Sequence, residues 1–313
     1  MKIVVVGCGS IGSRYVRWLN DFGVQVMACD SDPERLEAFK DLNDVVSATS
    51  LEYALSTQPD RVLVATPPNT HADVACASFD AGADVLIEKP IASTLEDAER
   101  IVDKANQLGR RAWVVCNIRF HDGPQTLKHN MSKIGSVLFA RVHFGHRLSQ
   151  MRPVGINVFA SNKEDGGGVI LDCIHEIDYL RWFFGEVDTV NSWVGQIGPD
   201  KIDAEDYAEI QLQFKSGVRV AVHLDFIMRR KRRGAEIIGT EGNLIWNSEG
   251  RAPENCTITF ADNKGEQILL HNPEVDSNAS YIRMLKDFLD GGDNLQSADD
   301  GLQALLVAIK AKE

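Results

Sequence analysis

The chain has 313 residues and a formal net charge of −12, from 33 lysines and arginines against 45 aspartates and glutamates. This negative balance argues against a nucleic-acid-binding surface and against a surface for anionic lipids. No apolar run approaches the roughly 18 residues of a membrane span, no secretory leader precedes the first strand, and the cysteines lack metal-ligand spacing. We therefore expect a soluble cytoplasmic protein without metal, nucleic-acid partner or membrane partner.

A glycine-rich turn follows the first apolar run, residues 3–6. The run predicts a buried parallel strand, and the periodic apolar residues after the turn predict a helix. In this turn Gly7 permits the tight bend, Gly9 lets backbone N–H groups approach a pyrophosphate, and Gly12 lets helix and strand pack closely. We expect a dinucleotide cofactor to bind here, through Gly7, Gly9, Ser10, Ile11 and Gly12. An ordinary strand–turn–helix is the alternative.

The next apolar strand, residues 24–29, ends at an acidic residue, Asp30, which lies 18 positions after Gly12. A carboxylate at this place accepts hydrogen bonds from an adenosine ribose and repels a 2′-phosphate. The sequence therefore favours NAD as the cofactor over NADP.

Strand and helix signals alternate as far as residue 118. Asp32 is a predicted N-cap before Pro33, and the capping-box pattern of Ser93 and Glu96 predicts a helix that ends at Gly109. Three further strands are expected, at residues 61–65, 84–88 and 112–115. The alternation predicts an α/β fold with a Rossmann domain over residues 1–118, in which a doubly wound parallel sheet binds ligands at the carboxyl ends of its strands.

Beyond this point strand-like runs follow one another with few helices between them. They lie at residues 137–144, 190–194, 208–214, 218–226 and 237–246, and two amphipathic helices at 280–289 and 297–309 follow. We expect a second domain, residues 119–313, of the α+β class with an open, mostly antiparallel sheet. Because its helices are too few to cover both faces of the sheet, we expect a homodimer or, next, a homotetramer.

Two polar motifs follow expected strands of the first domain. Glu88 and Lys89 end one strand, and Lys89 could hold and partly deprotonate a substrate hydroxyl beside a nicotinamide. A solvated surface lysine is the alternative. We expect cofactor contacts from Glu88 and Lys89 and, after another strand, from Thr66, Pro67, Asn69 and His71. His71 as a helix-start residue without a ligand is the alternative.

Residues 166–185 begin with a glycine triplet and continue as a predicted helix. On it, Asp172, His175 and Tyr179 share one side, opposite an apolar face. A carboxylate one turn before a histidine can fix its tautomer and raise its basicity, so His175 could act as a general base with Asp172 as its partner. A solvated polar face is the alternative. The basic run 229–233 is either a solvated connection or a receptor for an anionic substrate or an acidic partner subunit.

Together these residues resemble the glucose–fructose oxidoreductase / inositol dehydrogenase (Gfo/Idh/MocA) family over essentially the whole chain. The resemblance also includes residues 238–242 and 298–302, and Asn117 and Arg119 at the domain junction. It implies a dinucleotide-dependent oxidoreductase acting on sugars, cyclitols and their derivatives. By resemblance, Lys89 and His175 are catalytic with Asp172, and Lys89, Asn117, Arg119, Asp172 and His175 contact the substrate.

One departure from the family is the spacing of Asp172 and His175, which is three residues rather than the usual four. The runs 148–153 and 175–179 resemble members that act in surface-polysaccharide pathways, which indicates an acidic or nucleotide-linked sugar. Two alternatives stay open. One is a redox-neutral lyase or epimerase that retains NAD, and the other is a non-catalytic NAD(H)-sensing regulator.

Overall fold

The computed structural model of the protein describes residues 1–151, 159–162, 166–251 and 253–313. By its internal contacts the chain forms two compact units, residues 1–115 with 285–305, and residues 116–284 with 306–313. We expected one division after residue 118. In the structure the division falls near that position, but a late segment, 285–305, groups with the first unit.

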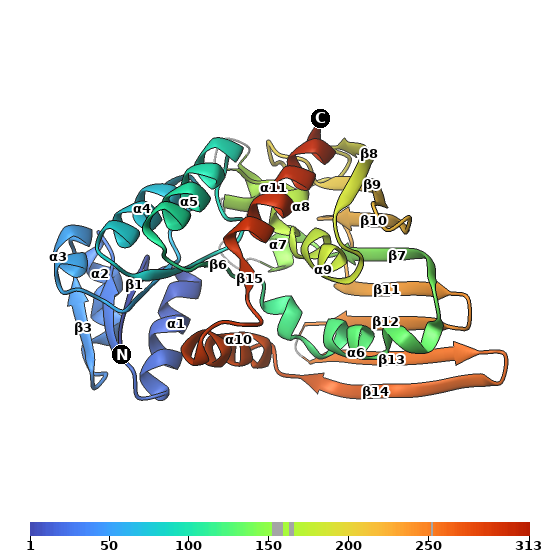
Figure 1. The fold of residues 1–313 in the computed structure, drawn as a ribbon, viewed down its shortest axis with the longest axis horizontal. Coiled ribbons are helices and arrows are strands. Elements are labelled where there is room, and N and C mark those ends of the chain that lie inside the picture. Colours follow the sequence, from blue (N-terminus) through green and yellow to red (C-terminus); the bar gives the residue numbers. More distant parts are fainter. Residues whose placement is uncertain (152–158, 163–165, 252) are drawn as a thin grey trace. The chain divides into compact units, whose positions relative to one another are not determined.

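The first unit is built on a seven-stranded sheet (Figure 1), whose strand order is β15-β6-β5-β4-β1-β2-β3. The strands are β1 (Lys2–Val6), β2 (Gln25–Cys29), β3 (Val45–Ala48), β4 (Arg61–Val64), β5 (Asp84–Ile87), β6 (Ala112–Val114) and β15 (Gln296–Ser297). The first six pair in parallel, which confirms the predicted Rossmann domain. β15 adds an antiparallel edge beside β6.

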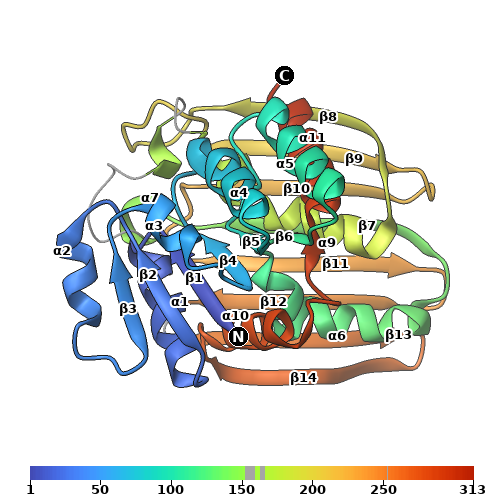
Figure 2. The same cartoon turned by 60° about the vertical axis from the view of Figure 1, so that its left-hand side comes forward.

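Helices connect these strands: α1 (Ser10–Asp21), α2 (Pro33–Leu36), α3 (Leu51–Ser56), α4 (His71–Asp80) and α5 (Leu95–Leu108). Helices α4 and α5 lie side by side (Figure 2). The Asp32 cap is confirmed, since its side chain accepts a hydrogen bond from the Glu34 N–H. The predicted capping box is wrong by one residue, because Thr94 rather than Ser93 has the extended backbone of an N-cap and accepts from the Asp97 N–H. At the other end of α5, Gly109 adopts a left-handed φ of 60°, as predicted.

The segment 285–305 joins the first unit through contacts that the local sequence pattern does not reveal. The indole ring of Trp113 meets the ring of Phe288 edge to face, with centroids 5.7 Å apart. A Cβ atom on Gly301 would lie 2.6 Å from a methyl group of Val114, so this glycine permits close packing against β6. Helices α10 (Ala279–Asp290) and α11 (Ala298–Lys312) therefore each contribute residues to both units.

The second unit is built on an eight-stranded sheet with the order β14-β13-β12-β11-β7-β10-β9-β8. The strands are β7 (Val137–Gly145), β8 (Val187–Gly195), β9 (Tyr207–Phe214), β10 (Arg219–Asp225), β11 (Arg232–Gly239), β12 (Asn243–Gly250), β13 (Glu254–Asp262) and β14 (Gly265–Val275). Only β7 and β10 pair in parallel in the described sheet, so the prediction of a mostly antiparallel sheet is confirmed. Strands β13 and β14 were not predicted.

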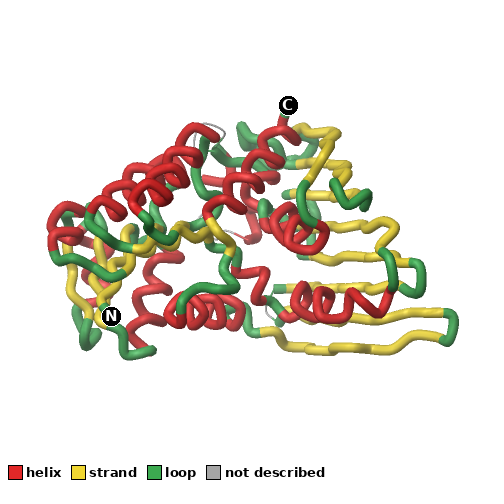
Figure 3. The backbone as a smooth tube through the Cα atoms, in the orientation of Figure 1, coloured by secondary structure: helices red, strands yellow, loops and turns green. Residues whose placement is uncertain are grey.

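Short helices accompany this sheet: α6 (Asp122–Asn130), α7 (Leu148–Met151), α8 (Val169–Asp172), α9 (His175–Phe184) and the 3₁₀ turn η3 (Asn117–Phe120). Within the described part of the unit, Figure 3 shows the helices on one face of the sheet. The other face carries exposed side chains such as Phe139 and Trp193, which are 36% and 79% exposed. Among the described residues, no helix has the length and apolar character that crossing a bilayer requires.

Candidate functional site

The glycine turn between β1 and α1 has little room for side chains except at Gly9. Gly7 adopts a φ of +89°, and a Cβ atom there would lie 2.7 Å from the backbone of Ala65. A Cβ atom on Gly12 would lie 1.8 Å from the Gly7 carbonyl oxygen, whereas one on Gly9 would meet nothing within 4 Å. Gly9 is the N-cap residue of α1 and has no side chain to cap the helix. The turn is thus tight at Gly7 and Gly12 and open at Gly9, where we predicted the backbone to approach a pyrophosphate.

The Asp30 carboxylate ties the end of β2 to this turn. Its Oδ2 atom accepts a hydrogen bond of 2.7 Å from the Cys8 N–H, and its Oδ1 atom accepts one of 2.9 Å from the Asp32 N–H. The Arg35 guanidinium lies 3.4 Å away and is half exposed. With the hydrogen bond that Arg35 donates, three groups donate to this carboxylate. Since a carboxylate offers about four lone-pair positions, about one remains for a ribose hydroxyl. The arrangement fits the predicted ribose contact and also stiffens the turn.

Glu88 and Lys89 follow β5, at the same carboxyl edge of the sheet as the glycine turn. The Tyr15 hydroxyl and the Lys89 N–H both donate hydrogen bonds to the Glu88 carboxylate. Burial raises the pKa of Glu88, although the Tyr15 hydroxyl opposes the shift. Glu88 therefore links α1 to the residue that we predicted to be catalytic. The peptide bond between Lys89 and Pro90 is cis.

His71 joins two loops at this edge. Its ring is fully buried, with Nε2 2.9 Å from the Thr66 carbonyl oxygen and Nδ1 3.1 Å and 3.2 Å from the carbonyl oxygens of Pro90 and Ile91. Burial lowers the pKa of His71. These contacts favour the interpretation of His71 without a ligand, as a side chain that positions Thr66 and Pro90. Pro67 and Asn69 are exposed at the same edge.

The predicted continuous helix at 170–180 is two helices, which corrects the sequence interpretation. Asp172 is the last residue of α8, His175 is the first residue of α9, and Cys173 and Ile174 interrupt the helix between them. Asp172 is partly exposed, His175 is 9% exposed, and Tyr179 is fully buried. The solvated polar face is therefore excluded for His175 and Tyr179.

Buried ion pairs fix helix α9 on several sides. Arg119 donates two hydrogen bonds to Asp178, from Nε at 2.8 Å and from Nη2 at 2.6 Å. Arg233 reaches Glu176 at 2.6 Å, and the Glu176 side chain is fully buried. Sequence reasoning missed Asp178 and Glu176, although Asp178 lies one helical turn after His175.

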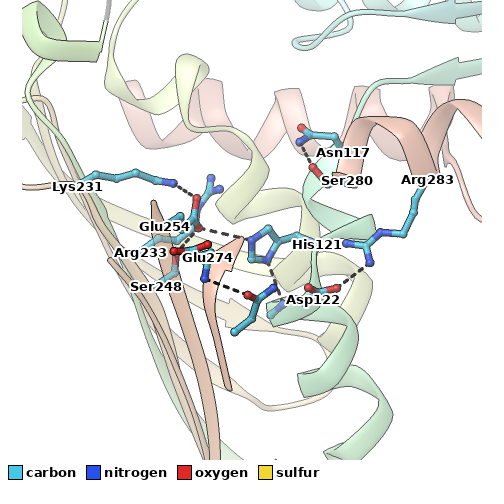
Figure 4. Close-up of polar contacts among 12 residues, drawn as sticks. Asn117, His121, Asp122, Lys231, Arg233, Ser248, Glu254, Glu274, Ser280 and Arg283 are labelled. Carbon is cyan, nitrogen blue, oxygen red and sulfur yellow. Dashed lines mark hydrogen bonds and ion pairs between the residues drawn. The ribbon is translucent and has the colours of Figure 1, made fainter. Parts of the chain in front are cut away.

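Two of the residues predicted to contact substrate make contacts within the second unit. Arg119, whose side chain is 6% exposed, holds Asp178, and Asn117 donates a hydrogen bond of 2.9 Å to the Ser280 hydroxyl (Figure 4). These contacts favour a positioning role for Arg119, while Asn117 is partly exposed. Lys89 belongs to the first unit, and Asn117, Arg119, Asp172 and His175 belong to the second.

Two residues of the basic run 229–233, Lys231 and Arg233, pair with carboxylates of the second unit, so the run as a whole is neither a solvated connection nor an open anion receptor. Lys231 lies 2.6 Å from Glu254, which also accepts a hydrogen bond from the Ser248 hydroxyl and lies 3.5 Å from His121 (Figure 4). Although burial opposes it, these partners hold the pKa of Glu254 well below its usual range, with the His121 contact first among them. Within the run, Lys231 and Arg233 thus neutralise the buried carboxylates of Glu254 and Glu176.

The described residues contain no group of three His, Cys, Asp or Glu side chains that could hold a metal ion. Residues 152 and 153 of the predicted motif 148–153 lie outside the described residues.

Comparison with known proteins assigns both parts of the chain to one family. Residues 1–116 match the description "Oxidoreductase family, NAD-binding Rossmann fold", and residues 130–245 match "GFO/IDH/MocA C-terminal domain". The 1,5-anhydro-D-fructose reductase of Ensifer adhaerens is 30% identical over 258 residues, which cover 80% of this chain and 76% of the relative. Myo-inositol 2-dehydrogenase of Thermotoga maritima is 26% identical over 100% of this chain and 96% of its own.

Among solved structures, the fold is similar to that of the WlbA dehydrogenase from Bordetella pertussis in complex with NADH and UDP-GlcNAcA. The TM-score is 0.81 and the identity 22%, with 100% of this chain and 95% of that chain covered. At this identity the likeness shows the fold alone.

Proposed function

Because the chain belongs to the GFO/IDH/MocA family of oxidoreductases, we propose that it transfers a hydride between NAD and a secondary alcohol or ketone of a sugar, cyclitol or sugar derivative. The observation that carries this proposal is the glycine turn, which is open only at Gly9 and is tied to Asp30. Both features suit a dinucleotide whose pyrophosphate lies over the turn and whose ribose meets the carboxylate.

The residues at this edge fit NAD chemically. Backbone N–H groups of Ser10, Ile11 and Gly12 at the start of α1 would receive the pyrophosphate, because the N-cap residue Gly9 has no side chain to cap them. Thr66, Pro67 and Asn69 would line the same edge. The bound nicotinamide would supply the carbon that accepts the hydride in oxidation and returns it in reduction.

Lys89 and His175 have the chemistry that alcohol oxidation needs. As the hydride leaves carbon, the hydroxyl proton must be accepted, and a neutral imidazole can take it. The Lys89 ammonium would stabilise the developing alkoxide. We assign Asp172 a supporting role beside the substrate, because it is partly exposed and ends α8 three residues before His175 begins α9.

The substrate class rests on the named relatives, which act on an anhydro sugar and an inositol. A nucleotide-linked or acidic sugar is the finer proposal from the sequence motifs. A thermal-shift screen of sugars, cyclitols and sugar nucleotides with NAD present identifies the ligand, because a compound that binds the native state raises the melting temperature.

With that ligand, Lys89→Ala and His175→Ala should each lower kcat at least ~100-fold, the usual size of general acid–base effects, while NAD affinity stays near wild type. Lys104→Ala and His271→Ala are matched controls at exposed or half-exposed positions outside the proposed site. Wild-type turnover by the His175 variant would remove His175 from the mechanism. Release of reduced nicotinamide during turnover distinguishes net oxidation from a redox-neutral reaction.

A further inference from the structure

A buried chain of side chains leads from Arg119 to His175 inside the second unit. The Cys116 sulfur lies 3.5 Å from Nδ1 of His175 and 2.6 Å from Oδ2 of Asp178. Arg119 donates to both oxygens of the same carboxylate. Cys116 and Asp178 are each 2% exposed and Arg119 is 5% exposed, so the contacts are shielded from water.

The direction of the hydrogen bonds follows from the chemistry of these groups. A carboxylate held by a guanidinium through two N–H donors acts only as an acceptor. The thiol hydrogen therefore points from Cys116 to Asp178. Sγ then presents a lone pair to His175, and a lone pair is satisfied by an N–H. Nδ1 consequently carries the ring hydrogen.

We propose that Cys116 is a positioning residue for His175. The Arg119–Asp178 pair orients the Cys116 thiol, and the thiol sulfur in turn fixes His175 as the Nδ1–H tautomer. In a neutral imidazole this leaves the lone pair on Nε2, the form that can accept a hydroxyl proton. The proposal rests on the proposed function for the identity of the base. It adds to Asp172, the partner expected from the sequence, a thiol from a different segment.

A thiol can orient the ring without placing a second negative charge beside Asp178. A carboxylate in direct contact with Nδ1 raises the basicity of the ring, whereas sulfur is a weak acceptor that orients the ring with little added charge. Burial, and then the neighbouring Asp178, raise the pKa of Cys116 well above its ordinary value. The thiol therefore stays protonated instead of acting as a nucleophile. It keeps the hydrogen that it donates to Asp178.

The tautomer can be read directly from the full-length protein by two-dimensional ¹H–¹⁵N NMR of its histidine rings, without substrate. The His175 signals are identified by their loss in His175→Gln, and spectra are recorded at a pH at which this ring is neutral. The wild type should show a pyrrole-type nitrogen at Nδ1 and a pyridine-type nitrogen at Nε2. Cys116→Ser should retain this pattern, because a hydroxyl also donates to Asp178 and accepts from Nδ1. Cys116→Ala should lose it.

The control is Cys256→Ala, which removes another fully buried thiol of the same unit. It should leave the His175 spectrum unchanged. A protonated Nε2 in the wild type, or an unchanged tautomer in Cys116→Ala, would overturn the proposal. If Cys116→Ala does not fold, Cys116→Ser decides. The serine hydroxyl should donate to Asp178 and accept from Nδ1 as the thiol does, so a protonated Nε2 in this variant would contradict the proposal.

A kinetic readout separates the positioning role from the proposed function. Cys116→Ala should lower kcat by about 10-fold or more, the effect that losing an orienting partner has on metal-bound histidines, with KM nearly unchanged and activity restored in Cys116→Ser. If His175→Ala keeps wild-type turnover, His175 is not the base and the catalytic assignment fails. The NMR result still decides whether Cys116 sets the tautomer.

Discussion

Alanine substitutions at Gly9 and Gly12 separate the two functions of the glycine turn, cofactor access and chain packing. On Gly12 the new Cβ atom would lie 1.8 Å from the Gly7 carbonyl oxygen, and real Cβ contacts are not shorter than 3.0 Å. The turn must open to admit it. Such overpacking costs about 1–3 kcal/mol, which lowers the melting temperature of Gly12→Ala by roughly 2–12 °C.

Gly9→Ala should leave the stability of the fold unchanged and weaken NAD binding. Its φ is −68°, which an L-residue adopts, and its Cβ atom would meet nothing within 4 Å. The free energy of unfolding should therefore change by no more than ~0.5 kcal/mol. The methyl group would occupy the space through which the backbone approaches the pyrophosphate, so NAD affinity should fall at least about tenfold, or ~1.4 kcal/mol.

The assay pairs calorimetric titration of NAD with thermal unfolding in its absence, with Gly195→Ala as the control for a Cβ atom added in open space. Wild-type NAD affinity in Gly9→Ala would refute the placement of the pyrophosphate. An unchanged melting temperature in Gly12→Ala would refute the packing argument.

Asp30→Ala should lower the preference for NAD over NADP about tenfold, because it removes a ribose contact and frees the Arg35 guanidinium, 3.4 Å away, for a 2′-phosphate. Titration of both cofactors checks this, and an unchanged preference contradicts it. Hydrogen bonds with Asp225, and then with Glu209, raise the pKa of His223 to about 9, against the opposing effect of burial. This folded-state pKa exceeds the ordinary 6.5. The contacts of protonated His223 with Asp225 and Glu209 should therefore stabilise the fold fully below pH 6.5, and this stabilisation should be lost as the pH rises through about 9. Since the ring is 31% exposed, we expect about 1 kcal/mol; urea unfolding from pH 6 to 10 should show the loss in the wild type and not in His223→Gln. Light scattering at ~0.5 M salt should give a dimer, and a mass of 34.6 kDa at every concentration would contradict the proposed assembly.

Local patterns in the sequence predicted the Rossmann domain well, because its signals are local. The apolar run before Gly7, the acid at the end of β2 and the αL glycine at 109 each act within a few residues of their own position. The capping box was misplaced by one residue because Ser93 and Thr94 are both good caps, and only backbone geometry distinguishes them. Strand β14 was missed because most of its residues are exposed and its apolar residues do not alternate, whereas β13 carries an alternation at Cys256, Ile258 and Phe260 that the prediction overlooked.

The candidate site was only partly predictable, since its contacts join segments far apart in the sequence. Cys116 and Asp178 are 62 residues apart, and neither is distinctive alone. The helix break between Asp172 and His175 cannot be read from periodicity, because the interrupting residues Cys173 and Ile174 continue the apolar pattern and are buried. In the same way, the pairing of β15 with β6 depends on a return of the chain that no local pattern encodes.

The central claim is hydride transfer to NAD with proton transfer to His175. Its most direct test is a single-turnover measurement of reduced nicotinamide, with enzyme in excess and the carbohydrate that most raises the melting temperature in the presence of NAD. Wild-type enzyme should form reduced nicotinamide in stoichiometric amount, and His175→Ala should form it at least ~100-fold more slowly with unchanged NAD affinity. Equal rates in the two proteins, or no reduced nicotinamide from any carbohydrate that the wild type binds, would contradict the account.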